Sequence, residues 1–66
     1  MICLSINGAI QTLQAHSVEG MVQELRLPAP LLLVEHNGLA LKKSEWTSTP
    51  LQEGDRIEIL RISAGG

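Results

Sequence analysis

The chain opens with MICLSINGAIQTL (residues 1–13), and this stretch decides the fold. In Met1–Ile6 every second residue is a large apolar one, which is typical of a strand with one buried face. Asn7-Gly8 suits a two-residue type I′ turn, because both residues tolerate positive φ. Ala9–Leu13 then predicts the returning strand, so we expect the chain to begin with a β-hairpin.

One helix is expected after the hairpin. Four apolar residues recur at the spacing that forms a single helical stripe: Val18, Met21, Val22 and Leu25. Ser17 is the predicted N-cap, since a serine hydroxyl can accept from the free N–H groups of the first turn. The helix should end by Leu27, because Pro28 cannot continue it.

The second half of the chain predicts further strands. Leu31–His36 is short and apolar and precedes a second Asn-Gly turn at Asn37-Gly38, so a third strand is expected there. A short segment follows around Ala40-Leu41, and then a single helical turn, Ser44–Trp46, capped by its serine. After a turn at residues 53–55, Arg56–Ile62 predicts the final strand.

One helix packed on one face of a mixed sheet accommodates this order of elements. If the last strand lies beside the first, the two run parallel in the sheet centre, which is the β-grasp arrangement. The expected fold class is therefore α+β, with four to five strands and one main helix. Residues 1–62 are expected to form this domain, and residues 63–66 a flexible tail that ends in Gly-Gly.

Size and composition argue against several function classes. A chain of 66 residues has room for one small domain, and little room for a deep pocket beside its core. A formal net charge of −2, no basic run and a single aromatic residue argue against nucleic-acid binding. Cys3 is the only cysteine, so neither an internal disulfide nor a cysteine metal cluster is expected. Without a long apolar run or a signal-peptide pattern, we expect a soluble cytoplasmic protein with no metal and no membrane contact.

Four short motifs occur in order along the chain: Asn7-Gly8, VEHNG at residues 34–38, Lys43 three residues before Trp46, and LQEGDRIEI at residues 51–59. The sequence then ends in Gly65-Gly66. From end to end, this ordered set resembles the thiamin-biosynthesis sulfur carrier family, which is ubiquitin-like and has the β-grasp fold. His36 departs from the family pattern, where an aliphatic residue is expected, and so does Lys42, where proline is common.

The resemblance implies a function for the terminal carboxylate. In that family an activating enzyme uses ATP to adenylate the terminal glycine, which is Gly66 in this sequence. Sulfur, usually from a cysteine desulfurase, then converts the acyl-adenylate to a thiocarboxylate that supplies thiazole synthase. The chain would thus be a protein co-substrate and not an enzyme, with no bound cofactor of its own. Ser63, Ala64 and Gly65 would form a thin arm, since small residues let the backbone pass close to the walls of a partner.

Three alternatives stay open. The small subunit of molybdopterin synthase shares the fold and the Gly-Gly end, but it is typically longer and richer in aromatic residues. A ubiquitin-like modifier would join its terminal glycine to a lysine, and the tail alone does not separate thiocarboxylate from isopeptide use. The chain could also be a non-catalytic interaction module whose tail is inert.

A partner-binding surface is predicted on the open face of the sheet. Alternation along the strands places Leu33, Leu60 and Ile62 on the face away from the helix. Exposed aliphatic side chains clustered on a sheet indicate a docking surface, unless loops cover them. Arg61 is a further candidate, either paired with acidic groups of a partner or simply solvated.

No intrinsic catalytic site is expected. Cys3 is interpreted as a small strand residue, because no basic residue near it in the sequence would activate it. The two histidines lack a nucleophile or carboxylate at a meaningful spacing. Trp46 is expected to cover the edge of the core, and Glu53 and Asp55 are interpreted as solvated turn residues.

Overall fold

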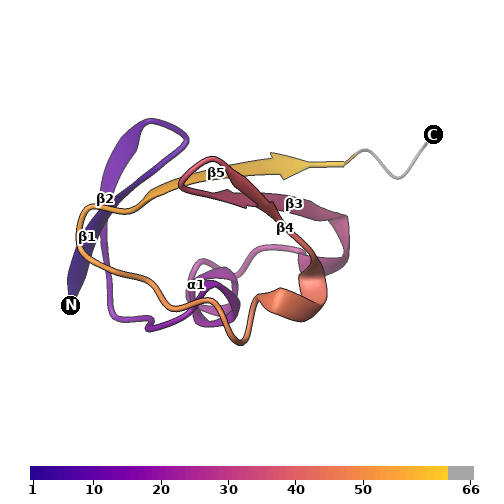
Figure 1. The fold of residues 1–66 in the computed structure, drawn as a ribbon, viewed down its shortest axis with the longest axis horizontal. Coiled ribbons are helices and arrows are strands. Elements are labelled where there is room, and N and C mark those ends of the chain that lie inside the picture. The colour runs from indigo at the N-terminus through magenta and orange to yellow at the C-terminus, as the bar shows by residue number, and fades with distance from the viewer. Residues whose placement is uncertain (63–66) are drawn as a thin grey trace.

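A computed structural model describes residues 1–62 of the chain. Figure 1 shows one twisted sheet with the α-helix lying across one of its faces. The elements in this part of the chain are, in order, β1 (Ile2–Ile6), β2 (Ala9–Leu13), α1 (Val18–Glu24), the 3₁₀ helix η1 (Ala29–Leu31), β3 (Leu32–His36), β4 (Leu39–Leu41), the 3₁₀ helix η2 (Lys43–Glu45) and β5 (Arg56–Arg61).

The sheet has the strand order β2-β1-β5-β3-β4. β1 and β5 run parallel, and the other neighbouring strands are antiparallel. The last strand therefore lies beside the first, which confirms the β-grasp arrangement. Their pairing is short, because only Ser5 and Ile6 of β1 face Arg56 and Ile57 of β5.

Both Asn-Gly turns have the predicted backbone conformation. φ is 51° at Asn7 and 84° at Gly8, and it is 52° at Asn37 and 88° at Gly38. Positive φ at both central residues is the mark of the type I′ turn, whose twist matches that of the flanking strands. The opening hairpin pairs residue for residue, from Ile2 opposite Leu13 to Ile6 opposite Ala9.

The helix begins and ends within the predicted limits. The hydroxyl of Ser17 accepts a hydrogen bond from the backbone N–H of Gly20 at 3.1 Å, which confirms Ser17 as the N-cap. The helix ends at Glu24, and Arg26 then takes a φ of 56°. The N–H of Leu27 still donates to the carbonyl of Val22 at 3.1 Å, so this turn satisfies a carbonyl of the last helical turn.

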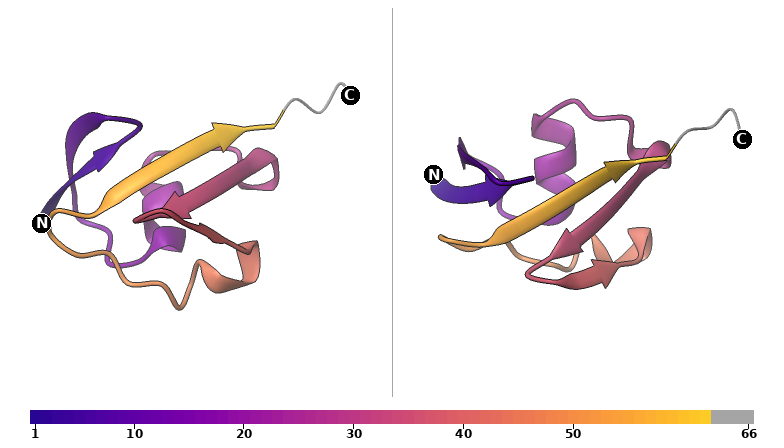
Figure 2. Two further views of the ribbon diagram at one scale, coloured as in Figure 1. Left: turned by 45° about the horizontal axis from the view of Figure 1, so that its top comes forward. Right: turned by 90° about the horizontal axis from the view of Figure 1, so that it is seen from above.

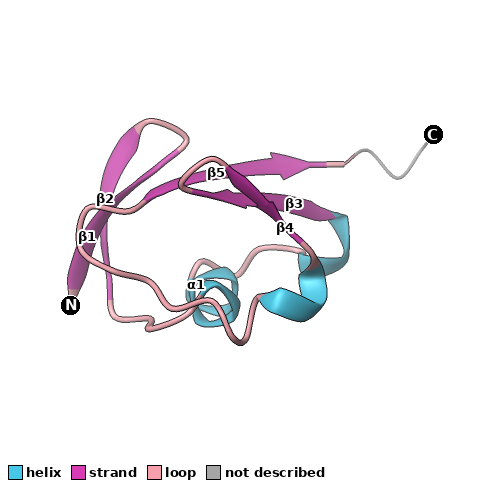
Figure 3. Ribbon diagram, in the orientation of Figure 1, coloured by secondary structure: helices cyan, strands magenta, loops and turns pink. Residues whose placement is uncertain are grey.

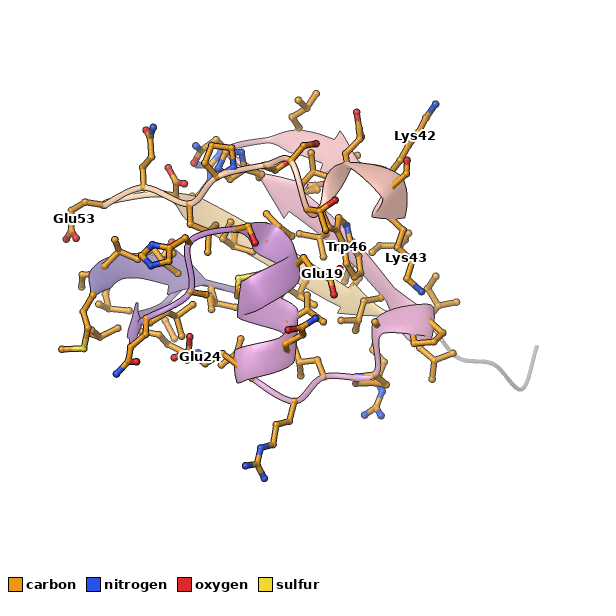
Figure 4. The ribbon with its side chains drawn as sticks, turned by 90° about the horizontal axis from the view of Figure 1, so that it is seen from below. Glu19, Glu24, Lys42, Lys43, Trp46 and Glu53 are labelled. Atoms are coloured by element: carbon orange, nitrogen blue, oxygen red, sulfur yellow. The ribbon has the colours of Figure 1, made fainter. Side chains whose placement is uncertain are left out.

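The core lies between α1 and the sheet and is built almost entirely from aliphatic residues. Its buried members are Leu4, Ile6, Leu13, Val18, Met21, Val22, Leu32, Val34, Trp46, Leu51 and Ile57. Trp46 is only 1% exposed, so the expectation that it covers the edge of the core is wrong. The segment after η2 runs past the N-terminus of α1, where the carbonyl of Trp46 accepts from the N–H of Glu19 at 3.1 Å. That path places the indole inside the core, near Glu19 and Lys43 (Figure 4).

Three element boundaries differ from the predictions. The 3₁₀ turn η2 is capped by Lys42 and not by Ser44, because the Glu45 carboxylate accepts from the N–H of Lys42 at 2.7 Å. β3 begins at Leu32, since Leu31 closes η1. β5 ends at Arg61, although the N–H of Ile62 still donates to the carbonyl of Leu31. Figure 3 shows these two short helical turns and the long loop between η2 and β5.

Candidate docking face and the strand that leads to the carboxyl terminus

The three apolar residues predicted for partner binding lie exposed on the open face of the sheet. Leu33 of β3 and Leu60 of β5 are directly opposite each other in the register. Their exposed fractions are 53% and 65%, and that of Ile62 is 46%. The loops of the described chain therefore leave these side chains uncovered. We call Leu33, Leu60 and Ile62 the apolar patch.

Two carboxylates border the apolar patch, and sequence reasoning did not single them out. Glu35 and Glu58 are also directly opposite each other, two residues along the strands from Leu33 and Leu60, and both are exposed. Like charges in this position weaken a sheet. Within residues 1–62 the single ion pair joins two other residues, so neither carboxylate has a cationic partner there. Period-two alternation could have found this pair, because Glu58 and Leu60 share a face.

Arg61 does not extend the apolar patch. It is opposite Leu32, which is buried in the core, so its side chain leaves the sheet on the helix side. The residue itself is exposed. The structure thus places the Arg61 side chain and the apolar patch on different faces of β5.

Asn7 fixes β5 from the side of β1. Its amide nitrogen donates to the carbonyl of Ile59 at 3.0 Å, and its amide oxygen accepts from the N–H of Ile59 at 2.7 Å. Its backbone N–H also donates to the carbonyl of Ile57 at 2.9 Å. The Asn7 side chain therefore makes the two hydrogen bonds to Ile59 that the backbone of a neighbouring strand would otherwise make.

Asn37 holds β5 from the side of β3. Its side-chain oxygen accepts from the N–H of Arg56 at 2.7 Å, while its backbone N–H donates to the carbonyl of Arg56 at 2.8 Å. The two turn asparagines thus pin the strand that leads toward the carboxyl terminus. The Asn-Gly motif predicts the turns, but nothing in it predicts these second contacts.

Asp55 is the centre of a polar cluster, and its interpretation as a solvated turn residue is wrong. It is only 7% exposed. Its carboxylate accepts from the amide of Asn37 at 3.1 Å and from the N–H of Gln52 at 2.9 Å, and it contacts Nε2 of His36 at 2.8 Å. Burial would raise the pKa of Asp55, but the hydrogen bonds from Asn37, Gln52 and His36, with the charge of His36, hold it below 3.8.

His36 therefore does have a carboxylate partner, which the sequence spacing did not indicate. The two residues are 19 positions apart, and the fold joins them where β3 ends and β5 begins. Glu53 has a structural contact too, since its carboxylate accepts from the N–H of Cys3 at 2.9 Å. Both contacts tie the loop before β5 to the rest of the sheet.

The described residues contain no group of three or more histidine, cysteine, aspartate or glutamate side chains that could hold a metal ion. No pocket is found in this part of the chain either. None of its helices is long and apolar enough to cross a membrane. Ser63, Ala64, Gly65 and Gly66, which were predicted to carry the chemistry, lie outside the described residues.

Comparisons with known proteins agree on one family. The model of the ThiS family matches residues 4–66. The crystal structure of a thiamine biosynthesis protein (ThiS) from Geobacter metallireducens is 30% identical, with a TM-score of 0.83, and the match covers 98% of this chain and 100% of that one. An NMR solution structure of a thiamine biosynthesis protein from the same organism is 28% identical, with a TM-score of 0.79, over 98% of this chain and 88% of that one. A comparison with curated proteins found no match.

Proposed function

Because the chain belongs to the ThiS family, we propose that it is a sulfur carrier of thiamin biosynthesis that works through the carboxylate of Gly66. The observation that carries this proposal is the family match, which extends over residues 4–66 and so includes Gly65 and Gly66. The structural likeness to a ThiS protein along nearly the whole chain supports it.

The proposed chemistry begins with a carboxylate that is a poor acyl donor. An activating enzyme lets an oxygen of the Gly66 carboxylate attack the α-phosphorus of ATP, and pyrophosphate leaves. A persulfide supplied through a cysteine desulfurase then displaces AMP from the carbonyl carbon and gives an acyl disulfide. A thiol reductant cleaves the S–S bond of that acyl disulfide, is itself oxidised to a disulfide, and leaves the thiocarboxylate. Thiazole synthase takes the sulfur from that group. In this scheme the chain is a co-substrate, and its partners supply the catalytic groups.

The body of the domain has two roles in this proposal. The pinned β5 gives the carboxyl terminus a fixed point of departure, because Asn7 and Asn37 hold the strand from both sides. The apolar patch docks on the activating enzyme and on thiazole synthase, since exposed apolar clusters on a small domain mark interaction sites.

Intact mass spectrometry tests the chemistry. The protein is incubated with ATP, the activating enzyme, a cysteine desulfurase and cysteine. We expect a mass gain equal to the replacement of one oxygen by sulfur, localised to Gly66, and no gain in a variant that lacks Gly66. An adduct on lysine in cell extract would instead favour the ubiquitin-like modifier, and no change in either experiment would favour the inert module.

A pair of substitutions tests the docking face. Leu60 and Leu39 are both 65% exposed, but only Leu60 belongs to the apolar patch. We expect Leu60→Asp to weaken binding to the activating enzyme by about tenfold or more, since it places a charge in a desolvated contact. Leu39→Asp is the matched control and should bind as the wild type does. Equal binding by both variants, measured by isothermal titration calorimetry, would contradict the proposed face.

A further inference from the structure

The second half of β5 has a neighbour on one side only. β1 pairs with β5 at Ser5 and Ile6 and then turns away at Asn7-Gly8. β3 remains paired with β5 as far as Leu32 opposite Arg61. Figure 2 shows β5 continuing past the hairpin, with β3 along one edge. A strand that begins in the centre of the sheet therefore ends as an edge strand.

Successive residues of β5 direct their backbone groups to opposite sides. The carbonyl of Arg56 accepts from the N–H of Asn37, and the N–H of Ile62 donates to the carbonyl of Leu31. Both residues therefore bond toward the β3 side. Ile57 and Ile59 bond toward β1, where the N–H of Asn7 donates to the carbonyl of Ile57 and the Asn7 amide bonds both backbone groups of Ile59. The next residue in this second series is Arg61. Its N–H and C=O face the side that β1 has left, and no residue among 1–62 pairs with them.

We propose that the activating enzyme pairs an extended segment of its own backbone with this free edge of β5, beginning at Arg61. This inference rests on the proposed function for the identity of the partner. The interaction is β-strand addition, in which an exposed strand edge offers its N–H and C=O groups to a second chain.

The structure sets the register of this pairing. Because the Asn7 amide already satisfies both backbone groups of Ile59, an added strand cannot pair further back along β5. Its first position is therefore Arg61. Leu60 and Ile62 flank that position on the open face, so the added strand is continuous with the apolar patch. A segment bound there lies five residues from Gly66 in the sequence.

A second copy of the chain is a poorer occupant of this edge. Within residues 1–62 it could contribute only the two backbone groups of its own Arg61. Two or so hydrogen bonds without a large buried area do not hold a stable dimer. An enzyme can form the same two hydrogen bonds with Arg61 and in addition bury the apolar patch under its own surface.

Amide hydrogen exchange on the full chain tests the pairing, with the activating enzyme and ATP as the probe. We expect the N–H of Arg61 to exchange rapidly in the free protein and at least about tenfold more slowly in the complex. The N–H of Leu60 is the internal control and should be slow in both, because it faces β3. Unchanged exchange at Arg61 overturns the proposal, and so does protection that appears with protein concentration alone.

Two substitutions separate the backbone of Arg61 from its side chain. Proline is tolerated in a strand where the N–H points outward, so Arg61→Pro should fold and yet bind the enzyme at least about tenfold more weakly. Arg61→Ala keeps the N–H and should bind as the wild type does. Equal weakening by both variants would identify a side-chain contact and overturn the proposal. If the proline variant does not fold, the exchange experiment on the unaltered protein still decides.

A measurement of pyrophosphate release with the wild-type chain distinguishes the two proposals. Without carrier-dependent release the proposed function fails, and the edge pairing fails with it because it names that enzyme. With normal release but no protection at Arg61, only the edge pairing fails.

Discussion

Replacing Asn7 by glycine removes the side-chain contact between the first hairpin and Ile59 of β5, and leaves the backbone pairing of β1 with β5 in place. Glycine adopts the φ of 51° at this position without strain, so the turn itself should persist. The two hydrogen bonds to Ile59, at 2.7 and 3.0 Å, are lost. At about 0.5–1.5 kcal/mol each, their loss should lower the free energy of unfolding by about 1–3 kcal/mol. Since a core in a domain of this size rarely supplies more than about 3–5 kcal/mol, the effect should be large.

Urea denaturation followed by circular dichroism measures this change, and we expect a lower midpoint with an unchanged slope. Asn7→Ala is the companion variant and should be less stable still, because a Cβ at positive φ adds about 1 kcal/mol or more of strain. Exchange of the Ile59 N–H should also become faster in Asn7→Gly. If the free energy of unfolding of Asn7→Gly lies within about 0.5 kcal/mol of the wild-type value, and the Ile59 N–H stays protected from exchange, the Asn7 amide does not hold β5.

Two further predictions concern Asp55 and Trp46. Since the pKa of Asp55 is lower in the folded state than 3.8, its stabilisation is present above about pH 4 and is lost as the pH falls through the folded value. Asp55→Asn should therefore be less stable than the wild type at pH 7, and the difference should shrink below pH 4; thermal melts showing a constant difference would contradict this. Trp46→Ala should cost about 3–5 kcal/mol and leave the chain unfolded at 25 °C by circular dichroism. Trp46→Phe should stay folded, since Nε1 of Trp46 is buried without a hydrogen-bond partner among the described residues and phenylalanine loses no hydrogen bond there. A cooperative melt of Trp46→Ala near the wild-type melting temperature would refute this account.

The sequence determined the local elements and the faces they present. Period-two alternation and two Asn-Gly turns identified the strands and hairpins, because strand geometry and positive φ depend on neighbouring residues only. The helical stripe and the Ser17 cap were confirmed for the same reason. Alternation also placed Leu33, Leu60 and Ile62 on the open face, where the structure finds them exposed.

Only the tertiary structure decided which distant side chains meet. Asn7 contacts Ile59, 52 positions away, and His36 contacts Asp55, 19 positions away. Neither separation corresponds to a sequence pattern from which the contact could be predicted. The free edge at Arg61 is of this kind as well, because it depends on where β1 turns away from β5. Such contacts depend on how the strands are arranged in the sheet, so they follow from the packing of the whole chain and not from any local pattern of residues.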